Sequence, residues 1–250
     1  MKVVAIIPAR YNSTRFQGKP LADICGKPMI WWVYNQVLKS SKIDEVWVAT
    51  DDERIADICK QYDMKYVMTS ENCPTCTTRI YEASTKIDAD LYMHVNGDEP
   101  LIDPALLESI IPDNDYNKDF YVSNLMTKMS KPSEVVDFTN IKIVVDSNNN
   151  CLFMSRSPIP YPKGSLDFDY YKHVGVMIYT KSALEFYANT PRGNMERVED
   201  VDYIRFLEND KKLKMIEVEA HTLSVDTPKD LEVVKKLVKE KIDSGEISNK

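Results

Sequence analysis

The chain has 250 residues, 43% of them hydrophobic and 28% charged, which is typical of a soluble globular protein with a sizeable core. Its formal net charge of −7 argues against a general nucleic-acid-binding surface. The sequence contains no apolar run of about 18 residues, and the N-terminus has no signal-peptide pattern, so we expect a cytoplasmic protein without a membrane span. The five cysteines, an odd number, argue against a secreted disulfide framework.

The first predicted strand is the apolar run over residues 3–7, which leads directly into a cationic loop. In an open α/β sheet, ligands bind in the crevice beyond the carboxyl ends of the strands. Cations and small donors at such a point favour a polyanion, most naturally a triphosphate. A solvated basic loop is the alternative, and Pro20 after the lysine rules out a Walker A motif. The loop side chains concerned are Arg10, Asn12, Ser13, Thr14, Arg15 and Lys19.

Helical and strand patterns alternate over the next part of the chain. We predict helices over 28–40, from Glu53 onwards and over about 79–86, and strands over 45–50, 65–70 and 90–95. Acidic residues at 51–53 suit a helix start, because carboxylates complement the helix dipole. This order predicts an α/β fold with a doubly wound, mostly parallel sheet.

The middle of the chain has a different pattern. Strand-like stretches at 120–127, 141–146 and 151–154, with a turn at 147–150, precede a further strand within 170–179. A helix over 196–207, a strand over 216–221 and a final helix from Pro228, capped by Thr227, complete the prediction. We expect a single domain over 1–250, with a nucleotide half of about 1–110 and 210–245 and a β-rich acceptor and dimer insertion of about 111–209.

Two aspartates follow predicted strands and are candidate metal ligands. Asp98 lies in NGDEP and Asp226 in SVDTP. Magnesium takes oxygen ligands and is usually held by one or two carboxylates together with substrate phosphates. Taken singly, Asp98 also fits a turn residue and Asp226 a contributor to the helix cap.

The pair Cys73 and Cys76 forms a lone CxxC motif. A zinc site would need two further ligands, and the histidines (His94, His173, His221) are scattered along the chain. A redox pair is a further alternative. Free thiols in a loop are the default interpretation.

Residues 7–21, IPARYNSTRFQGKPL, resemble the opening of the 3-deoxy-manno-octulosonate (Kdo) cytidylyltransferase family, IPARYxSTRxPGKPL. Gln17 stands where that family usually has proline, and GDEP and VDTP extend the likeness. The resemblance implies a nucleotide-diphospho-sugar transferase-like fold, a homodimer, and a role in lipopolysaccharide or capsule biosynthesis. It implies CTP as substrate and Mg²⁺ on Asp98 and Asp226. It also implies Lys19, Asp98 and Asp226 as catalytic residues, with Arg10, Ser13, Arg15, Lys19 and Asn96 binding the nucleotide.

The resemblance carries over an acceptor site with several departures. The residues of this sequence at the family's acceptor-binding positions are Arg79, Asn96, Arg156, His173, Tyr179, Asp202 and Tyr203. The family usually has glycine, an acidic residue, glutamine, glutamate and glutamine where this sequence has Cys76, Thr78, Asn96, Asp202 and Tyr203. Changed hydrogen-bonding groups alter which hydroxyl pattern is accepted. The acceptor is therefore Kdo, a modified sugar acid, a sugar phosphate or a phosphonate. A different base, or a non-catalytic nucleotide-binding protein, is a further alternative.

Overall fold

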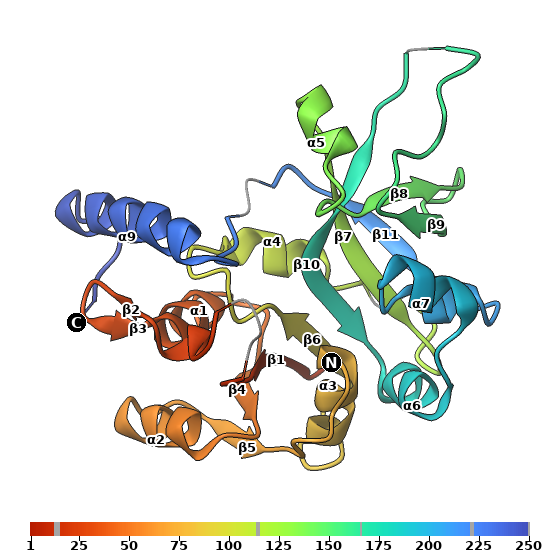
Figure 1. The fold of residues 1–250 in the computed structure, drawn as a ribbon. Helices are drawn as coiled ribbons and strands as arrows, with labels where there is room; N and C mark the ends of the chain where they lie inside the picture. The colour runs from red at the N-terminus through yellow and green to blue at the C-terminus, as the bar shows by residue number, and fades with distance from the viewer. Residues whose placement is uncertain (13–15, 114–115, 166, 221–222, 250) are drawn as a thin grey trace. The chain divides into compact units, whose positions relative to one another are not determined.

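The computed structural model describes residues 1–12, 16–113, 116–165, 167–220 and 223–249 (Figure 1). The chain forms two compact units, Met1–Glu108 with His221–Lys250, and Ser109–Ala220. We placed 210–220 in the nucleotide half from the sequence, whereas these residues belong to the second unit.

The sheet of the first unit is parallel, in the order β6-β1-β4-β5. The strands are β1 (Val3–Ala9), β4 (Glu45–Thr50), β5 (Tyr66–Met68) and β6 (Leu91–Val95). Residues 4–7 of β1 are fully buried, as expected of a strand covered on both faces. The order places the second and third strands on one side of β1 and the fourth on the other. A switch point of this kind opens a crevice beyond the carboxyl ends of β1 and β6.

The helices of the first unit are α1 (Met29–Val37), α2 (Glu53–Gln61), α3 (Cys76–Ser84) and α9 (Pro228–Asp243), and α4 (Pro104–Ser109) ends at the boundary. Side-chain caps mark the start of α2, α3 and α9 among these helices. Asp52 caps α2, and Thr227 forms a capping box with Asp230, as the sequence predicted for this helix start. Helix α3 begins three residues before the predicted start at Arg79, because Thr75 and Thr78 form a capping box there.

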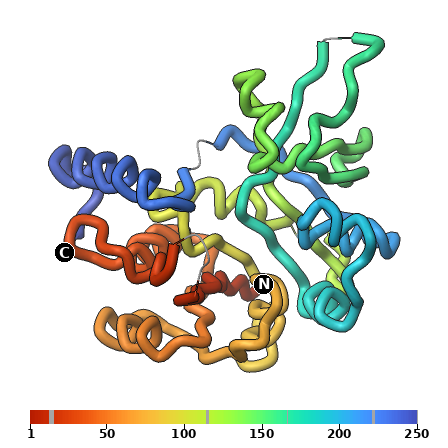
Figure 2. The backbone as a smooth tube through the Cα atoms, viewed as in Figure 1, coloured from red at the N-terminus to blue at the C-terminus, as the bar shows by residue number. Residues whose placement is uncertain are grey.

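The C-terminal segment contacts a hairpin in the N-terminal part of the chain. A short 3₁₀ turn, η1 (Lys19–Leu21), precedes the hairpin of β2 (Asp23–Ile24) and β3 (Lys27–Pro28). The side-chain amide of Asn249 donates to the Cys25 carbonyl at 3.1 Å. The C-terminus therefore lies beside this hairpin (Figure 2).

The second unit is built on a mixed sheet. Its strands are β7 (Val122–Lys128), β8 (Lys142–Val145), β9 (Cys151–Ser155), β10 (Tyr171–Tyr179) and β11 (Lys214–Glu217). Strand β7 pairs antiparallel with β10 and parallel with β11, and β8 pairs antiparallel with β9 and β10. The predicted turn at 147–150 and the hairpin that it joins are confirmed.

Short helices accompany the second sheet. They are α5 (Pro132–Val136), α6 (Lys181–Asn189), α7 (Asn194–Glu199) and α8 (Ile204–Leu207). The prediction of a single helix over 196–207 is wrong, because the structure has two short helices there. Asp200 adopts a left-handed conformation with φ 51°, which ends α7 before α8 begins.

Candidate functional site

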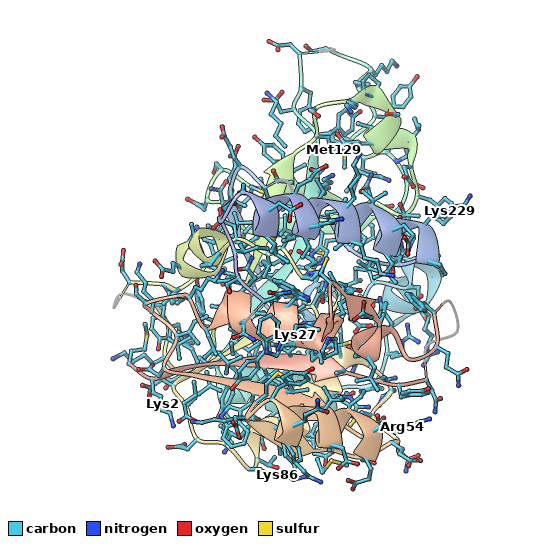
Figure 3. All side chains as sticks on the ribbon, turned by 90° about the vertical axis from the view of Figure 1, so that its left-hand side faces the viewer. Lys2, Lys27, Arg54, Lys86, Met129 and Lys229 are labelled. Carbon is cyan, nitrogen blue, oxygen red and sulfur yellow. The ribbon has the colours of Figure 1, made fainter. Side chains whose placement is uncertain are left out.

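A backbone hydrogen bond joins the two ends of the cationic loop after β1. The Gly18 amide donates to the Tyr11 carbonyl at 2.8 Å. Gly18 has φ 69°, and a Cβ there would meet the Tyr11 ring at 3.3 Å, so glycine suits the position. Arg54, labelled in Figure 3, lies at the start of α2. Its guanidinium carbon is 3.2 Å from the centroid of the same ring. These contacts fix both ends of the loop that precedes Lys19.

Lys19 lies between two carboxylates. Its ammonium group is 2.7 Å from Asp98 Oδ2 and 3.7 Å from Asp226 Oδ1. The side chains keep 16%, 21% and 39% of their surface exposed, so the cluster can be reached by a ligand. The structure thus brings together the three residues that the sequence assigned to catalysis.

Backbone packing explains why Asp98 and Asp226 meet. Gly97 follows β6, and a Cβ there would lie 3.1 Å from the Pro8 carbonyl of β1. A side chain would therefore push the two strand ends apart. The Val225 amide donates to the Asp98 carbonyl at 2.9 Å and brings the next residue, Asp226, to the same point.

Arg10 extends the positive charge of this region. The terminal nitrogen Nη2 of its guanidinium group donates to the Cys73 carbonyl. Its Nε is buried and has no partner among the described residues, and the same holds for Asp98 Oδ1. Such orphaned groups are uncommon and indicate that a ligand or ion completes the site. The predicted ligands Ser13 and Arg15 lie outside the described residues.

Asn96 and Glu99 flank Asp98. The Asn96 side chain donates to the Glu99 carboxyl group, which is only 4% exposed. Burial, together with the nearby charge of Asp98, raises the pKa of Glu99 to about 7. The Asn96 amide therefore orients a carboxyl group beside the candidate metal ligand, and its contacts with the nucleotide and the acceptor stay predictions.

Arg79 is bound by polar side chains of the first unit. Its side chain is 0% exposed, and the guanidinium donates to Thr69 Oγ1 and, at 2.6 Å, to Asp51 Oδ2. It thus joins the ends of β4 and β5 to α3. In this conformation it is not open to an acceptor, so its binding role stays a prediction.

Arg156, in the second unit, is held by backbone carbonyls. Its Nε donates to Glu199 O at 2.7 Å, and its terminal nitrogens donate to Phe138 O and Asp200 O, each at 3.1 Å. Lys142, which is fully buried, donates to the Arg156 carbonyl. Arg156 is therefore fixed in place by its surroundings, and its contact with an acceptor stays a prediction.

His173 and Tyr203 lie together in the second unit, with ring centroids 5.3 Å apart. His173 Nδ1 is 2.8 Å from Asn124 Oδ1, and burial lowers the pKa of His173 to about 4. Tyr179, by contrast, is 0% exposed and packs on Phe206. It is thus not brought to the surface with the other two, and its predicted contact with an acceptor is not available in this conformation.

Asp202 borders a buried ion pair. Glu196, 0% exposed, accepts from Arg205 at 2.7 Å and also from Arg192. Burial, and repulsion by Glu196, raise the pKa of Asp202. The charges of this ion pair therefore affect the ionisation of Asp202, which is also a candidate acceptor ligand.

The described residues contain no group of three or more His, Cys, Asp or Glu side chains that could hold a metal. None of the five cysteines forms a disulfide. The magnesium site predicted on Asp98 and Asp226 has only two carboxylates, so the absence of larger groups from the described residues does not test it. Within the described part of the chain, no helix is long and apolar enough to cross a membrane.

Sequence reasoning missed several polar residues that shape these regions. Asn124 and Lys142 are buried in strands β7 and β8. A polar residue inside an apolar strand pattern is an available signal, because a buried polar group needs partners. Glu99 follows Asp98 directly, yet nothing in its spacing predicts its burial.

The chain resembles known cytidylyltransferases over most of its length. Residues 4–216 match the family model described as "Cytidylyltransferase". A 3-deoxy-manno-octulosonate cytidylyltransferase of Trichlorobacter lovleyi is 39% identical over 96% of this chain and 100% of its own length. An 8-amino-3,8-dideoxy-manno-octulosonate cytidylyltransferase of Shewanella frigidimarina is 40% identical over 92% of this chain and 96% of its own. The solved structure of a CMP:2-keto-3-deoxy-manno-octonic acid synthetase complexed with CTP superposes with a TM-score of 0.91 at 37% identity. That superposition covers 96% of this chain and 100% of the solved chain.

Proposed function

This chain belongs to the cytidylyltransferase family, and from this membership we propose that it transfers CMP from CTP to an anionic eight-carbon sugar acid, with release of pyrophosphate. The acceptor is Kdo or its 8-amino relative, the two named among the similar proteins. The product then serves as a sugar donor in lipopolysaccharide or capsule synthesis. One observation carries the proposal: the Lys19 ammonium lies within 3.7 Å of a carboxylate oxygen of Asp98 and of one of Asp226.

The loop after β1 binds the triphosphate. Arg10 and Lys19 supply positive charge, and the orphaned Nε of Arg10 is a donor that a phosphate oxygen would satisfy. Ser13 and Arg15 add donors to the same loop by the family pattern. An acidic chain with a net charge of −7 needs this local concentration of cations to hold a polyanion.

Asp98 and Asp226 would hold Mg²⁺. The fit rests on Asp98 Oδ1, which is buried and has no partner in the described part of the chain, and on the Lys19 ammonium, which now contacts both carboxylates. These are the hard oxygen ligands that Mg²⁺ prefers. When bound, the metal would neutralise phosphate oxygens and lower the pKa of the attacking hydroxyl.

The residues themselves act mainly by positioning. A hydroxyl of the sugar acid attacks the α-phosphorus, the bond to the bridging oxygen breaks, and pyrophosphate leaves with the bonding electrons. Lys19 and Arg10 place charge where negative charge accumulates on phosphate oxygens. No covalent intermediate is required, so no nucleophilic side chain is assigned.

The second unit supplies groups that suit the acceptor. His173 and Tyr203 form a partly exposed aromatic pair, and Arg156 adds positive charge for an anionic sugar. Tyr203 replaces the family's glutamine, and Asp202 its glutamate. We therefore expect the hydroxyl pattern accepted here to differ from that of relatives that keep both residues.

We place this activity in a cytoplasmic homodimer. Free cysteines suit a reducing compartment, and the second unit exposes Val136, Phe138 and Tyr161 at 70% or more. Exposed apolar residues in such a group favour burial against a second copy. The mass in solution, measured by sedimentation equilibrium, is expected to be twice that of one chain. A single-chain mass at micromolar concentration would contradict the dimer.

The decisive variant is Asp98→Asn, which keeps the shape of the side chain but removes its charge. We expect pyrophosphate release to be lost, while calorimetry finds CTP affinity within about tenfold of wild type. Asp103→Asn is the matched control, because Asp103 lies nearby, is exposed and only caps α4 through the Ala105 amide. Retained turnover in Asp98→Asn would exclude the metal assignment.

A further inference from the structure

The side chain of Asn124 is fully buried and bridges an irregularity in the neighbouring strand. The register between β7 and β10 shifts between Val174 and Met177. Asn124 Nδ2 donates to the carbonyls of Val174 and Val176, each at 2.8 Å. An amide nitrogen has only two hydrogens to donate. Both are used here, so the orientation of the Asn124 amide is fixed.

This orientation determines which nitrogen of His173 carries a hydrogen. Asn124 Oδ1 faces His173 Nδ1 at 2.8 Å. A carbonyl oxygen can only accept, so Nδ1 must donate. Burial lowers the pKa of His173 to about 4, and the ring is therefore neutral at pH 7. A neutral ring with hydrogen on Nδ1 has a lone pair on Nε2.

The Nε2 atom is available to a ligand. His173 keeps part of its surface exposed, and its side-chain hydrogen bond within the described residues uses Nδ1. The Tyr203 ring lies 5.3 Å from the imidazole ring and limits its tilt. The ring is thus held on one edge by Asn124 and against one face by Tyr203.

We propose that Asn124 is a positioning residue that locks His173 in the Nδ1–H tautomer, so that Nε2 accepts a hydrogen bond from a hydroxyl or amino group of the acceptor. This inference rests on the proposed function. A lone pair repels carboxylate and phosphate oxygens, so His173 does not bind the acid group of the acceptor. It selects for a donor on the sugar, and an analogue without that donor leaves the interaction unmade.

The tautomer can be observed directly. The chain has only three histidines, so long-range ¹H–¹⁵N spectra of ¹⁵N-labelled protein give three ring patterns, and the variant His173→Asn identifies the one lost. At pH 7 we expect His173 to show a single Nδ1–H pattern. In Asn124→Leu we expect a mixture that includes the Nε2–H form. An Nε2–H or doubly protonated ring in the wild type would overturn the proposal, even if Asn124→Leu does not fold.

Kinetics test the consequence for the acceptor. His173→Asn keeps a polar group near Asn124 but removes Nε2, and we expect kcat/KM for the sugar acid to fall about fivefold to a hundredfold. The KM for CTP is expected to stay within about twofold. Deoxy analogues of the acceptor identify the group that Nε2 contacts. The analogue that lacks this group should be used equally well by wild type and by His173→Asn. An unchanged kcat/KM for the sugar acid in His173→Asn would overturn the proposed contact. If no acceptor reacts with the wild type, the proposed function fails, whereas the spectra still decide the tautomer.

Discussion

The environments of single side chains decide what their chemical groups can do in this protein. Lys19 and Arg79 are both cations in the first unit, yet Lys19 is partly exposed beside Asp98, and Arg79 is fully buried against Asp51. The sequence identified both as binding residues, because residue type and motif do not encode burial. A ligand can reach the first of them and cannot reach the second without rearrangement.

His173 also makes stability depend on pH. Its pKa in the folded protein, about 4, lies below the usual value near 6.5, so the unfolded chain binds a proton more readily in that interval. The free energy of unfolding should therefore fall as the pH decreases from about 6.5 to 4. We expect the wild type to lose about 1 to 3 kcal/mol more than His173→Asn over this range. Urea titrations of both proteins at several pH values measure the difference, and parallel curves would contradict the assignment.

At the level of elements, buried apolar runs were predictable and short helices were not. Strands β1, β4 and β6 appear at the predicted places, since short, mainly apolar runs leave few alternatives. Helix α5 spans only five residues, too few to show a helical period, and the sequence did not predict it. The break at Asp200 depends on a single left-handed residue, which periodicity cannot reveal.

The ion pair between Arg205 on α8 and Glu196 on α7 should hold these helices together. Both side chains are almost fully buried, at 5% and 0% exposure. In Arg205→Met the carboxylate stays buried without its main partner, and we expect a loss of about 3 to 5 kcal/mol in the free energy of unfolding. Lys60→Met, which breaks the exposed pair with Asp57, should cost far less, because solvent screens that pair. Equal losses in the two urea titrations would show that burial of the α7–α8 pair is not decisive.

For the whole molecule, the site was more predictable in its first unit than in its second. The end of β6 predicts the place of Asp98, because parallel strands deliver their following residues to one edge of a sheet. Asp226 instead lies in a loop well after β11, and the hydrogen bond from the Val225 amide to the Asp98 carbonyl brings it to Asp98, which no strand pattern predicts. The second unit depends on contacts such as Asn124 with His173, which are 49 residues apart. Contacts of this range follow from strand register and from a local irregularity in β10, neither of which spacing alone predicts.

In the proposed reaction, this chain joins CMP to a sugar acid. The most direct measurement is pyrophosphate release with each of the four nucleoside triphosphates, in the presence of Mg²⁺ and of Kdo, 8-amino-Kdo, a sugar phosphate or no acceptor. We expect release only with CTP together with one of the two sugar acids, and its loss when the metal is chelated. Tight binding of CTP without pyrophosphate release from any acceptor, or equal release with another nucleotide, would contradict the account.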